Sequence, residues 1–402
     1  MIYLDNAATA PMKKGAYEKM LPYLTKYYAN PSGAYDFSKQ SADAMDKARE
    51  QIASLIGADK NEIYFTSGGT ESDNWAIKGT ADLLQKKGRH IITTRIEHHG
   101  ILNTCKDLEK RGYKITYLEV DEYGMIKMDR LKKSIRPDTV LISVMTANNE
   151  IGTIQPIAEI GLIAKQNGIL FHTDAVQACG HIPIDVKKAN IDMLSASAHK
   201  FGGPKGIGFL YIRQDIALPS FMYGGSQEQG RRAGTGNVAS AVAMGEAADI
   251  CRNNMKQHMD YVTRLREYAI QRILREIPFV RLNGHRTRRL PGNMNFSFQF
   301  VDGEALLVML DMKGICASTG SACSTGSTEP SHVLMSIGLT EDLAHGSLRL
   351  TISEENNKKE IDTAIDEIKR SLFKLREMSN EYRHMVTPMS SYGKRMRRQY
   401  RY

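Results

Sequence analysis

The sequence predicts an α/β protein whose main sheet is mostly parallel and is covered by helices on both faces. Two observations lead to this prediction. Short runs rich in β-branched residues alternate with longer segments of helical periodicity up to about Ser240, and one long helical stretch and shorter strands follow. Apolar runs separated by helices are typical of parallel sheets that are buried on both faces. With 402 residues, 42% of them hydrophobic, the chain is long enough to form two domains.

Seven runs are the expected strands of the larger domain. In chain order they are IYFTSG from Ile63, HIITTRIEH from His90, KITYLEV from Lys114, VLISVMTA from Val140, ILFHTDA from Ile169, IDMLSASAH from Ile191 and IGFLYI from Ile207. The long helical stretch precedes two further strands, NMNFSF from Asn293 and SLRLTIS from Ser347. A long helix between a doubly wound sheet and a smaller mixed unit indicates a domain boundary, which we place near residue 255.

The expected organisation is a large domain (13–255), a smaller domain (1–12 with 256–380) and a basic C-terminal tail (381–402). Lysine and arginine outnumber aspartate and glutamate by 54 to 45, and residues 380–402 contain six of the basic residues and one glutamate. The body of the protein is therefore only mildly basic, and we do not expect it to bind nucleic acid. The run GKRMRRQYRY could contact an acidic partner or RNA, but such terminal runs are usually solvated.

The chain contains five cysteines, an odd number, and no CxxC pair. This pattern argues against a disulfide framework and a structural zinc site, and it fits a reducing compartment. No apolar run approaches the roughly 20 residues that a membrane helix needs. The opening MIYLDNAATA lacks the features of a signal peptide. We therefore expect a cytoplasmic protein that does not bind a membrane or a metal.

The first polar loop, TSGGTESDNW (66–75), follows the IYF run and precedes a helical stretch. Gly68 and Gly69 allow a tight turn, and the free backbone N–H groups at the start of a helix, together with the Thr70 hydroxyl, suit a phosphate. The alternative is an ordinary strand-to-helix turn in which Ser67 or Thr70 caps the helix. The loop alone does not separate these two interpretations.

In ILFHTDAVQ, Asp174 ends an apolar run and Gln177 follows three residues later. A carboxylate that emerges from a buried strand requires a cationic or protonated partner, because burial of an unpaired charge is costly. A protonated ring nitrogen would be such a partner. A helix-capping aspartate is the alternative.

The stretch SASAHKFGGPKGIG (195–208) must contain a loop, because its glycines and its proline do not continue a helix. It places Ser197, His199 and Lys200 at the end of a strand-like run, where ligands of open α/β sheets bind. A lysine nucleophile needs desolvation or a neighbouring positive charge, since its reference pKa lies far above neutrality. The alternative is a surface lysine in a glycine-rich loop.

Cys323 lies in STGSACSTGS (318–327), among serines, threonines and glycines. This composition is typical of an exposed loop, whereas most free cysteines are buried. An exposed thiol is sensitive to oxidation, so its position suggests use as a nucleophile.

Together and in this order, the segments resemble cysteine desulfurases of the NifS/IscS type, in the class V aminotransferase family of fold type I enzymes that depend on pyridoxal 5′-phosphate (PLP). The resemblance runs from Tyr3 to about Leu375. It is carried by YLDNAAT, NPSG, TSGGTES, the Glu97–His98 pair, NNEIG, HTDAVQ, SAHKFGGPKGIG, GTGN, STGSACS and EPSHVL. It implies a large domain with a mostly parallel seven-stranded sheet and a smaller α/β C-terminal domain.

The resemblance also implies a set of residues that bind PLP. Lys200 would hold the cofactor covalently, Asp174 would pair with the ring nitrogen, and Gln177 would bond the ring hydroxyl. The phosphate would be held by Gly69, Thr70, Ser197, His199 and, from the second subunit of a homodimer, Thr235.

The remaining implied residues act on the substrate. His98 would stack on the cofactor ring and act as an acid or base, and Asn149 would contact cofactor or substrate. Arg349 would bind the substrate carboxylate through its planar guanidinium. Cys323 would receive the sulfur as a persulfide.

The implied activity converts L-cysteine to L-alanine and passes sulfur from Cys323 to an acceptor protein, for iron–sulfur cluster assembly or for thiolation of tRNA or a cofactor. A selenocysteine lyase and another class V aminotransferase are alternatives, as is a non-catalytic scaffold. Tyr35, Ser38 and Ser353 depart from the residues common in the family, but none of them belongs to the implied site.

Overall fold

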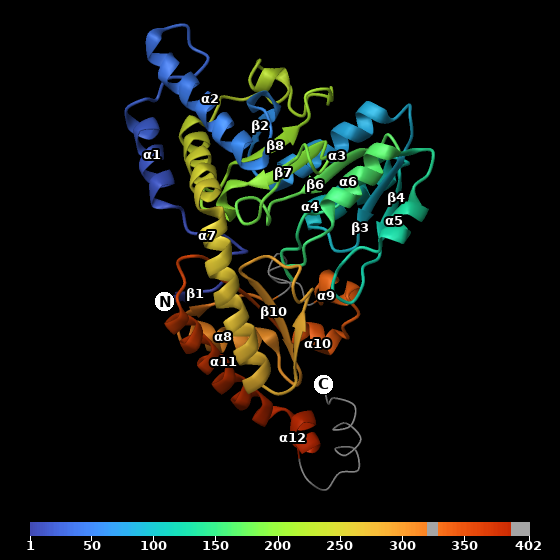
Figure 1. Cartoon of the computed structure of the whole chain (residues 1–402), viewed down its shortest axis with the longest axis vertical. Coiled ribbons are helices and arrows are strands. Elements are labelled where there is room, and N and C mark those ends of the chain that lie inside the picture. The colour runs from blue at the N-terminus through green and yellow to red at the C-terminus, as the bar shows by residue number, and fades with distance from the viewer. Residues whose placement is uncertain (320–328, 387–402) are drawn as a thin grey trace.

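The computed structural model describes residues 1–319 and 329–386. The chain forms two lobes, drawn one above the other in Figure 1. A single long helix, α7 (Val238–Glu276), runs through both of them. It begins at the Asn237 cap, whose side chain accepts a hydrogen bond from the backbone N–H of Ser240.

The upper lobe is built on a seven-stranded sheet with the order β2-β8-β7-β6-β5-β3-β4. Every neighbouring pair is parallel except the two pairs that involve β8. The predicted mostly parallel seven-stranded sheet is therefore confirmed, and each of its strands overlaps one of the seven predicted runs. The strands are β2 (Ile63–Thr66), β3 (His90–Thr94), β4 (Lys114–Leu118), β5 (Thr139–Ser143), β6 (Leu170–Asp174), β7 (Met193–Ser197) and β8 (Gly208–Ile212).

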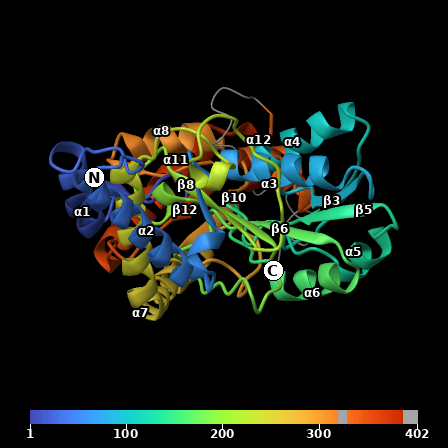
Figure 2. The ribbon, with the colours of Figure 1, turned by 90° about the horizontal axis from the view of Figure 1, so that it is seen from above.

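Helices cover both faces of this sheet. Successive residues of each strand point to opposite sides, and both sides carry apolar residues that the helices bury. Ile91 packs with residues of α3 and α4, whereas its neighbour Ile92 packs in the larger core on the other face. Figure 2 shows α3 and α4 on one side of the sheet and α5 and α6 on the other. The helices of this lobe are α1 (Lys14–Thr25), α2 (Asp36–Ile56), α3 (Gly69–Leu84), α4 (His99–Lys110), α5 (Met128–Ser134) and α6 (Ile157–Gln166), with short 3₁₀ turns η1 (Lys60–Glu62), η2 (Ala198–Lys200) and η3 (Glu228–Gly230).

The lower lobe contains an antiparallel sheet of order β12-β10-β9 and a parallel pair, β1 with β11. The two strands predicted beyond the long helix correspond to β10 and β12. The strands of this lobe are β1 (Ile2–Tyr3), β9 (Val280–Asn283), β10 (Asn293–Phe298), β11 (Ile315–Cys316) and β12 (Ser347–Thr351). Its helices are α8 (Gly303–Asp311), α9 (His332–Ser336), α10 (Glu341–His345), α11 (Lys358–Met378) and α12 (Asn380–Val386).

The hydrophobic cores packed against the two ends of α7 support a division of the chain near residue 255. Residues of α7 up to Cys251 pack in the core of the upper lobe, and those from Val262 onward pack in the core of the lower lobe. Leu4 belongs to the lower core although it lies near the N-terminus, because β1 pairs with β11. The predicted boundaries stay a proposal. The helix α12 extends to Val386, so the first residues of the predicted tail are helical.

In the two ranges that the structure describes, no helix combines the length and the apolar character needed to cross a bilayer.

The packing of α11 provides a test of the lower core. Ile365 is 1% exposed within that core, whereas Phe373 on the same helix is 60% exposed. Ile365→Ala is expected to lower the free energy of unfolding by about 2–5 kcal/mol, because it removes buried methyl groups and leaves a cavity. Phe373→Ala serves as the control and should change it little. Urea denaturation measures both, and equal effects would contradict this packing.

Candidate active site

The carboxyl ends of parallel strands meet at one edge of the sheet, and the loops after them enclose a pocket with about 310 Å³ of internal space. This size is in the range of small-molecule sites. The structure brings together most of the residues implied by the resemblance. The pocket is lined by Ala7, Ala8, Gly69, Thr70, Asp73, His98, Met145, Ala147, Asn149, Asp174, Val176, Gln177, Ser197, His199, Lys200 and Arg349.

One end of the pocket is formed by the start of α3 beside β7. The turn from β2 into α3 passes through Gly68 with φ +155°, a backbone conformation that side chains disfavour. The strand neighbour Gly208 also has to lack a side chain, since a Cβ there would lie 2.7 Å from the Cα of Gly68. Gly69 lies beside Ser197, because a Cβ on Gly69 would be 3.8 Å from that of Ser197, and Thr70 lines the same pocket. Backbone N–H groups at a helix start and nearby hydroxyls form a site suited to phosphate.

Asp174 ends β6 and is buried at the floor of the pocket. Its Oδ1 accepts a hydrogen bond of 2.8 Å from the backbone N–H of Val176. Burial raises the pKa of Asp174 to about 6, although this hydrogen bond and the charge of Lys200 act in the opposite direction. Burial also raises the pKa of the neighbouring Glu97, to about 8. A cation placed against Asp174 would favour its ionised form.

Lys200 ends the 3₁₀ turn η2 after β7, and its side chain reaches the pocket. Its Nζ donates to the backbone carbonyls of Ala7 at 2.6 Å and Ala8 at 2.8 Å. The amide of Gln177 donates to the same Ala7 carbonyl at 2.9 Å. The N-terminal segment is therefore part of the wall that orients the Lys200 amine.

His98 caps α4, and its Nδ1 accepts a hydrogen bond of 3.0 Å from the backbone N–H of Gly100. Burial lowers the pKa of His98 to about 4, and the charge of Lys200 and the neighbouring His99 act in the same direction. The ring is therefore neutral near pH 7. Because Nδ1 accepts, Nε2 carries the proton of the neutral ring.

Arg349 projects from β12 of the lower lobe and is only 2% exposed. Its guanidinium donates to the backbone carbonyl of Asn149 at 3.1 Å and to Asp5 at 2.9 Å. Its buried Nε has no hydrogen-bond partner among the described residues. These contacts fix the guanidinium at the pocket wall, where its planar group is suited to bind a carboxylate.

The segment that carries Cys323 begins and ends beside this wall. Cys323 itself lies outside the described residues. Before it, the backbone of Ser318 pairs with that of Arg349 through two hydrogen bonds of 2.6 and 3.2 Å. After it, the Ser331 hydroxyl donates to the buried carboxylate of Glu150, the neighbour of Asn149. The described residues on either side of the segment that carries Cys323 are thus attached to residues that form or adjoin the pocket.

Thr235 is the one described residue of the implied set that does not line the pocket. It lines a separate depression with Ser67, Gly206 and Arg232. Its contact with cofactor phosphate in a second subunit therefore stays a prediction.

The other cysteines do not line the pocket, as far as the described chain goes. Cys105, Cys179 and Cys251 are buried free thiols, and Cys316 is partly exposed in β11. Burial raises the pKa of Cys105 to about 12 and that of Cys251 to about 11. Such thiols stay protonated near neutral pH and are poor nucleophiles.

Sequence reasoning missed several residues of the site. Asp5 pairs with Arg349, the carbonyls of Ala7 and Ala8 hold the Lys200 amine, and Asp73 lies buried in the pocket wall. The first three belong to YLDNAATA, a segment that contributed to the resemblance without receiving a role. The sequence therefore marked this segment as characteristic of the family, but it did not indicate that its residues contact Arg349 and Lys200.

Comparison with known proteins places this geometry in a family. Residues 2–363 match the aminotransferase class-V family. A cysteine desulfurase IscS of Methanosarcina thermophila is 52% identical over 386 residues, which cover 95% of each chain. A cysteine desulfurase of Nostoc sp. is 46% identical over 379 residues, which cover 94% of each chain.

Solved structures agree with these matches. A NifS-like protein has a TM-score of 0.88 at 35% identity and covers 93% of this chain and 99% of its own. The protein SspA, solved in complex with cysteine, has a TM-score of 0.78 at 38% identity and covers 88% and 99%. The chain therefore belongs to the class V aminotransferase family, whose enzymes use PLP. Within this family it is similar to the NifS/IscS-like cysteine desulfurases over nearly its whole length.

The residues of the pocket fit PLP. The cofactor has an aldehyde, a basic ring nitrogen and a phosphate. The Lys200 amine, the buried Asp174 carboxylate and the start of α3 line one cavity and match these three groups. Burial raises the pKa of Asp174, so a protonated ring nitrogen beside it would stabilise its ionised form.

The burial of Asp174 predicts a pH-dependent stability of the cofactor-free protein. The folded-state pKa of about 6 lies above the roughly 3.9 of an unfolded aspartate, so the folded protein binds this proton more tightly. Stability should therefore fall as the pH rises from about 4 through 6. Asp174→Asn removes the buried charge and is expected to stabilise the cofactor-free protein at pH 7.5 by up to about 3 kcal/mol.

Thermal unfolding of the two proteins at pH 5 and pH 7.5 measures this effect, and the gain should be smaller at pH 5. Asp43→Asn, at an exposed position, is the control. A loss of stability in Asp174→Asn at pH 7.5 would contradict the prediction.

Proposed function

We propose that this protein is a PLP-dependent cysteine desulfurase that converts L-cysteine to L-alanine and transfers the sulfur to Cys323. The observation that carries the proposal is the single pocket in which Lys200, Asp174 and Arg349 meet. Relatives named cysteine desulfurase, about half identical over nearly the full chain, support it.

The cofactor would be held by the residues that the resemblance assigned. Lys200 would bind its aldehyde covalently, and the carboxylate of Asp174 would keep a proton on its ring nitrogen. When bound, PLP supplies an electron sink for the negative charge that develops when the substrate loses its α-proton. Gly69, Thr70, Ser197 and His199 would bind the phosphate, Gln177 would reach the ring hydroxyl, and His98 would stack on the ring. Thr235 of a second subunit would complete the phosphate site.

Arg349 would bind the carboxylate of L-cysteine and so direct the amine toward Lys200. The Lys200 Nζ, placed by the Ala7 and Ala8 carbonyls, would then move the α-proton. Asn149 lies at the same wall and would contact cofactor or substrate. His98 is neutral near pH 7 because burial lowers its pKa, and it carries its proton on Nε2, from which it could donate as an acid.

Sulfur transfer would need no external oxidant. The Cys323 thiolate attacks the substrate sulfur, the substrate carbon–sulfur bond breaks with its electron pair left on carbon, and that carbon gains a proton. L-cysteine and one thiol thus yield L-alanine and a persulfide. Ser318 and Ser331, on either side of Cys323 in the sequence, are attached beside the pocket, which supports Cys323 as the attacking thiol. The buried Cys105 and Cys251 are poor candidates for this role, because burial raises their pKa values.

The proposal also includes the sulfur acceptor, the oligomeric state and the cellular location of the protein. The persulfide would pass to an acceptor protein, and the relatives named IscS favour one in iron–sulfur cluster assembly over tRNA or cofactor thiolation. A homodimer is required if Thr235 acts across an interface. A cytoplasmic location is favoured because the described cysteines are free thiols.

Replacement of the thiol tests the sulfur step. Cys323→Ala is expected to keep the bound cofactor and to lose persulfide formation and alanine release with L-cysteine. Cys316→Ala, which removes a partly exposed cysteine, is the matched control and should retain both. Mass spectrometry of the protein and an alanine assay measure the outcome. Undiminished activity in Cys323→Ala would exclude the mechanism, and undiminished activity with selenocysteine alone would favour a selenocysteine lyase.

Replacement of the lysine tests cofactor attachment. Lys200→Ala is expected to remove the covalent link to PLP, with loss of the visible absorption band that is resistant to dialysis. Lys205→Ala, at an exposed position a few residues later, should keep the band. A colourless wild-type protein that fails to take up PLP would instead favour a non-catalytic scaffold, and a keto acid product without alanine would favour an aminotransferase.

A further inference from the structure

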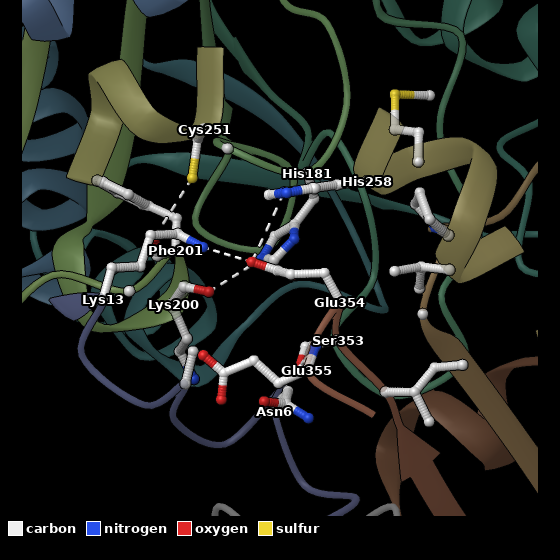
Figure 3. A pocket seen from close by; sticks show the side chains of 18 of the residues that line it. Asn6, Lys13, His181, Lys200, Phe201, Cys251, His258, Ser353, Glu354 and Glu355 are labelled. Atoms are coloured by element: carbon white, nitrogen blue, oxygen red, sulfur yellow. Dashed lines mark hydrogen bonds and ion pairs between the residues drawn. The ribbon is translucent and has the colours of Figure 1, made fainter. Parts of the chain in front are cut away.

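A second cavity lies against the Lys200 loop, at the boundary of the two lobes. Figure 3 shows side chains from the N-terminal segment, the Lys200 loop, α7 and the segment after β12 around it. Its internal space is about 50 Å³, enough for a water molecule or two but not for a substrate. We therefore consider the contacts between the residues that line this cavity, rather than the cavity itself, as the functional feature.

On one side of the cavity, three successive backbone carbonyls of the Lys200 loop each accept a hydrogen bond. His181 Nε2 donates to the carbonyl of Lys200 at 2.9 Å, and the Cys251 thiol donates to that of Phe201 at 3.4 Å. The backbone N–H of Lys13 donates to the carbonyl of Gly202 at 2.9 Å. Each donor comes from a different part of the chain, so the position of this loop depends on where those parts lie.

Lys13 also packs its side chain against the loop. Gly202 has φ +87°, and a Cβ there would lie 2.6 Å from the Lys13 Cγ. The loop therefore has room for the Lys13 aliphatic chain only because residue 202 is glycine. A shift of Lys13 would be transmitted directly to the backbone two residues after Lys200.

The other side of the cavity belongs to the lower lobe. The Nζ of Lys13 pairs with the carboxylate of Glu354, and His258 Nδ1 of α7 lies 3.6 Å from the same oxygen (Figure 3). The side chains of Lys13 and Glu354 are only 15% and 25% exposed. Glu354 follows β12, the strand that carries Arg349, by three residues. The pair therefore connects the Lys200 loop to the strand of the substrate-binding arginine.

Both members of the pair are charged near neutral pH. Burial alone would lower the pKa of Lys13, but nearby acidic groups, among them Glu354, raise it overall. Burial likewise opposes ionisation of Glu354, but Lys13 lowers its pKa. An ion pair that is shielded from solvent is less screened by salt than a surface pair.

We propose that Lys13 and Glu354 are positioning residues that fix the separation of Lys200 and Arg349, and thereby the placement of L-cysteine between them. This proposal rests on the proposed function, because it assigns the substrate amine to Lys200 and its carboxylate to Arg349. The two groups come from different lobes, so small displacements of one lobe change the distance that the substrate must span. Both groups bind the substrate already in its ground state, so a change in their separation weakens substrate binding and raises KM more than it lowers kcat.

Three variants test the pair without removing the surrounding packing. Lys13→Met keeps the aliphatic chain against Gly202, Glu354→Gln keeps the shape of the acid, and the double variant Lys13→Glu with Glu354→Lys reverses the pair. The matched control is Lys14→Met, which removes the neighbouring lysine, whose side chain is 89% exposed and pairs with Glu18 of the same helix.

Steady-state assays of the PLP-loaded enzymes should show a rise of about tenfold in KM for L-cysteine in both single variants, with a smaller change in kcat. The reversed pair should recover most of this loss, and Lys14→Met should match the wild type. Unchanged KM in both single variants would overturn the proposal. So would a reversed pair that restores the melting temperature but not KM, because the pair would then be only structural.

Hydrogen–deuterium exchange of the cofactor-free proteins gives a readout that does not depend on activity. The single variants should exchange faster than the control at residues 198–203 and 347–354, the two segments that the pair connects. If the single variants exchange faster but the wild-type enzyme has no activity on L-cysteine, the proposed function is contradicted, whereas the connection of the two segments by Lys13 and Glu354 is supported. Exchange equal to that of Lys14→Met would overturn that connection itself.

Discussion

The active site depends on one constraint, which is that the N-terminal segment 2–13 must lie between the two lobes. It pairs with β11 of the lower lobe at its start, and Asp5 binds Arg349. A few residues later, backbone carbonyls of the same segment hold the amine of Lys200, and Lys13 then contacts both the Lys200 loop and Glu354. A stretch of about a dozen residues thus positions the two groups that would bind opposite ends of the substrate.

The pocket is built around ionisable groups whose charged forms are disfavoured by burial. Burial raises the pKa values of Asp73, Glu97 and Asp174 and lowers that of His98. An environment of this kind costs stability in the empty protein and strengthens the binding of a cation beside Asp174. The same arrangement explains why a cofactor with a protonated ring nitrogen suits the site, because it supplies the charge that the pocket lacks.

The sequence allowed much of the fold and the pocket to be predicted, for identifiable reasons. The alternation of strand-like and helical runs fixed the seven strands, since a buried parallel sheet requires apolar strands joined by helices. Asp174, Ser197 and Lys200 stood at the ends of such runs, and carboxyl ends of parallel strands share one edge. Thr70 was predicted by the same argument, because it lies in the polar loop that follows the IYF run. Arg349 came only from the resemblance, because an arginine within a strand of a different sheet carries no local signal.

Sequence by itself therefore determined the elements, the edge at which the loops gather and the residue types that chemistry would need there. Tertiary structure alone decided which distant residues meet: Asp5 with Arg349, Ala7 with Lys200 and Lys13 with Glu354. Periodicity and loop composition are local properties, whereas these contacts join positions hundreds of residues apart in the sequence. They exist because the N-terminal segment lies between the two lobes, and only the folded chain brings those lobes together.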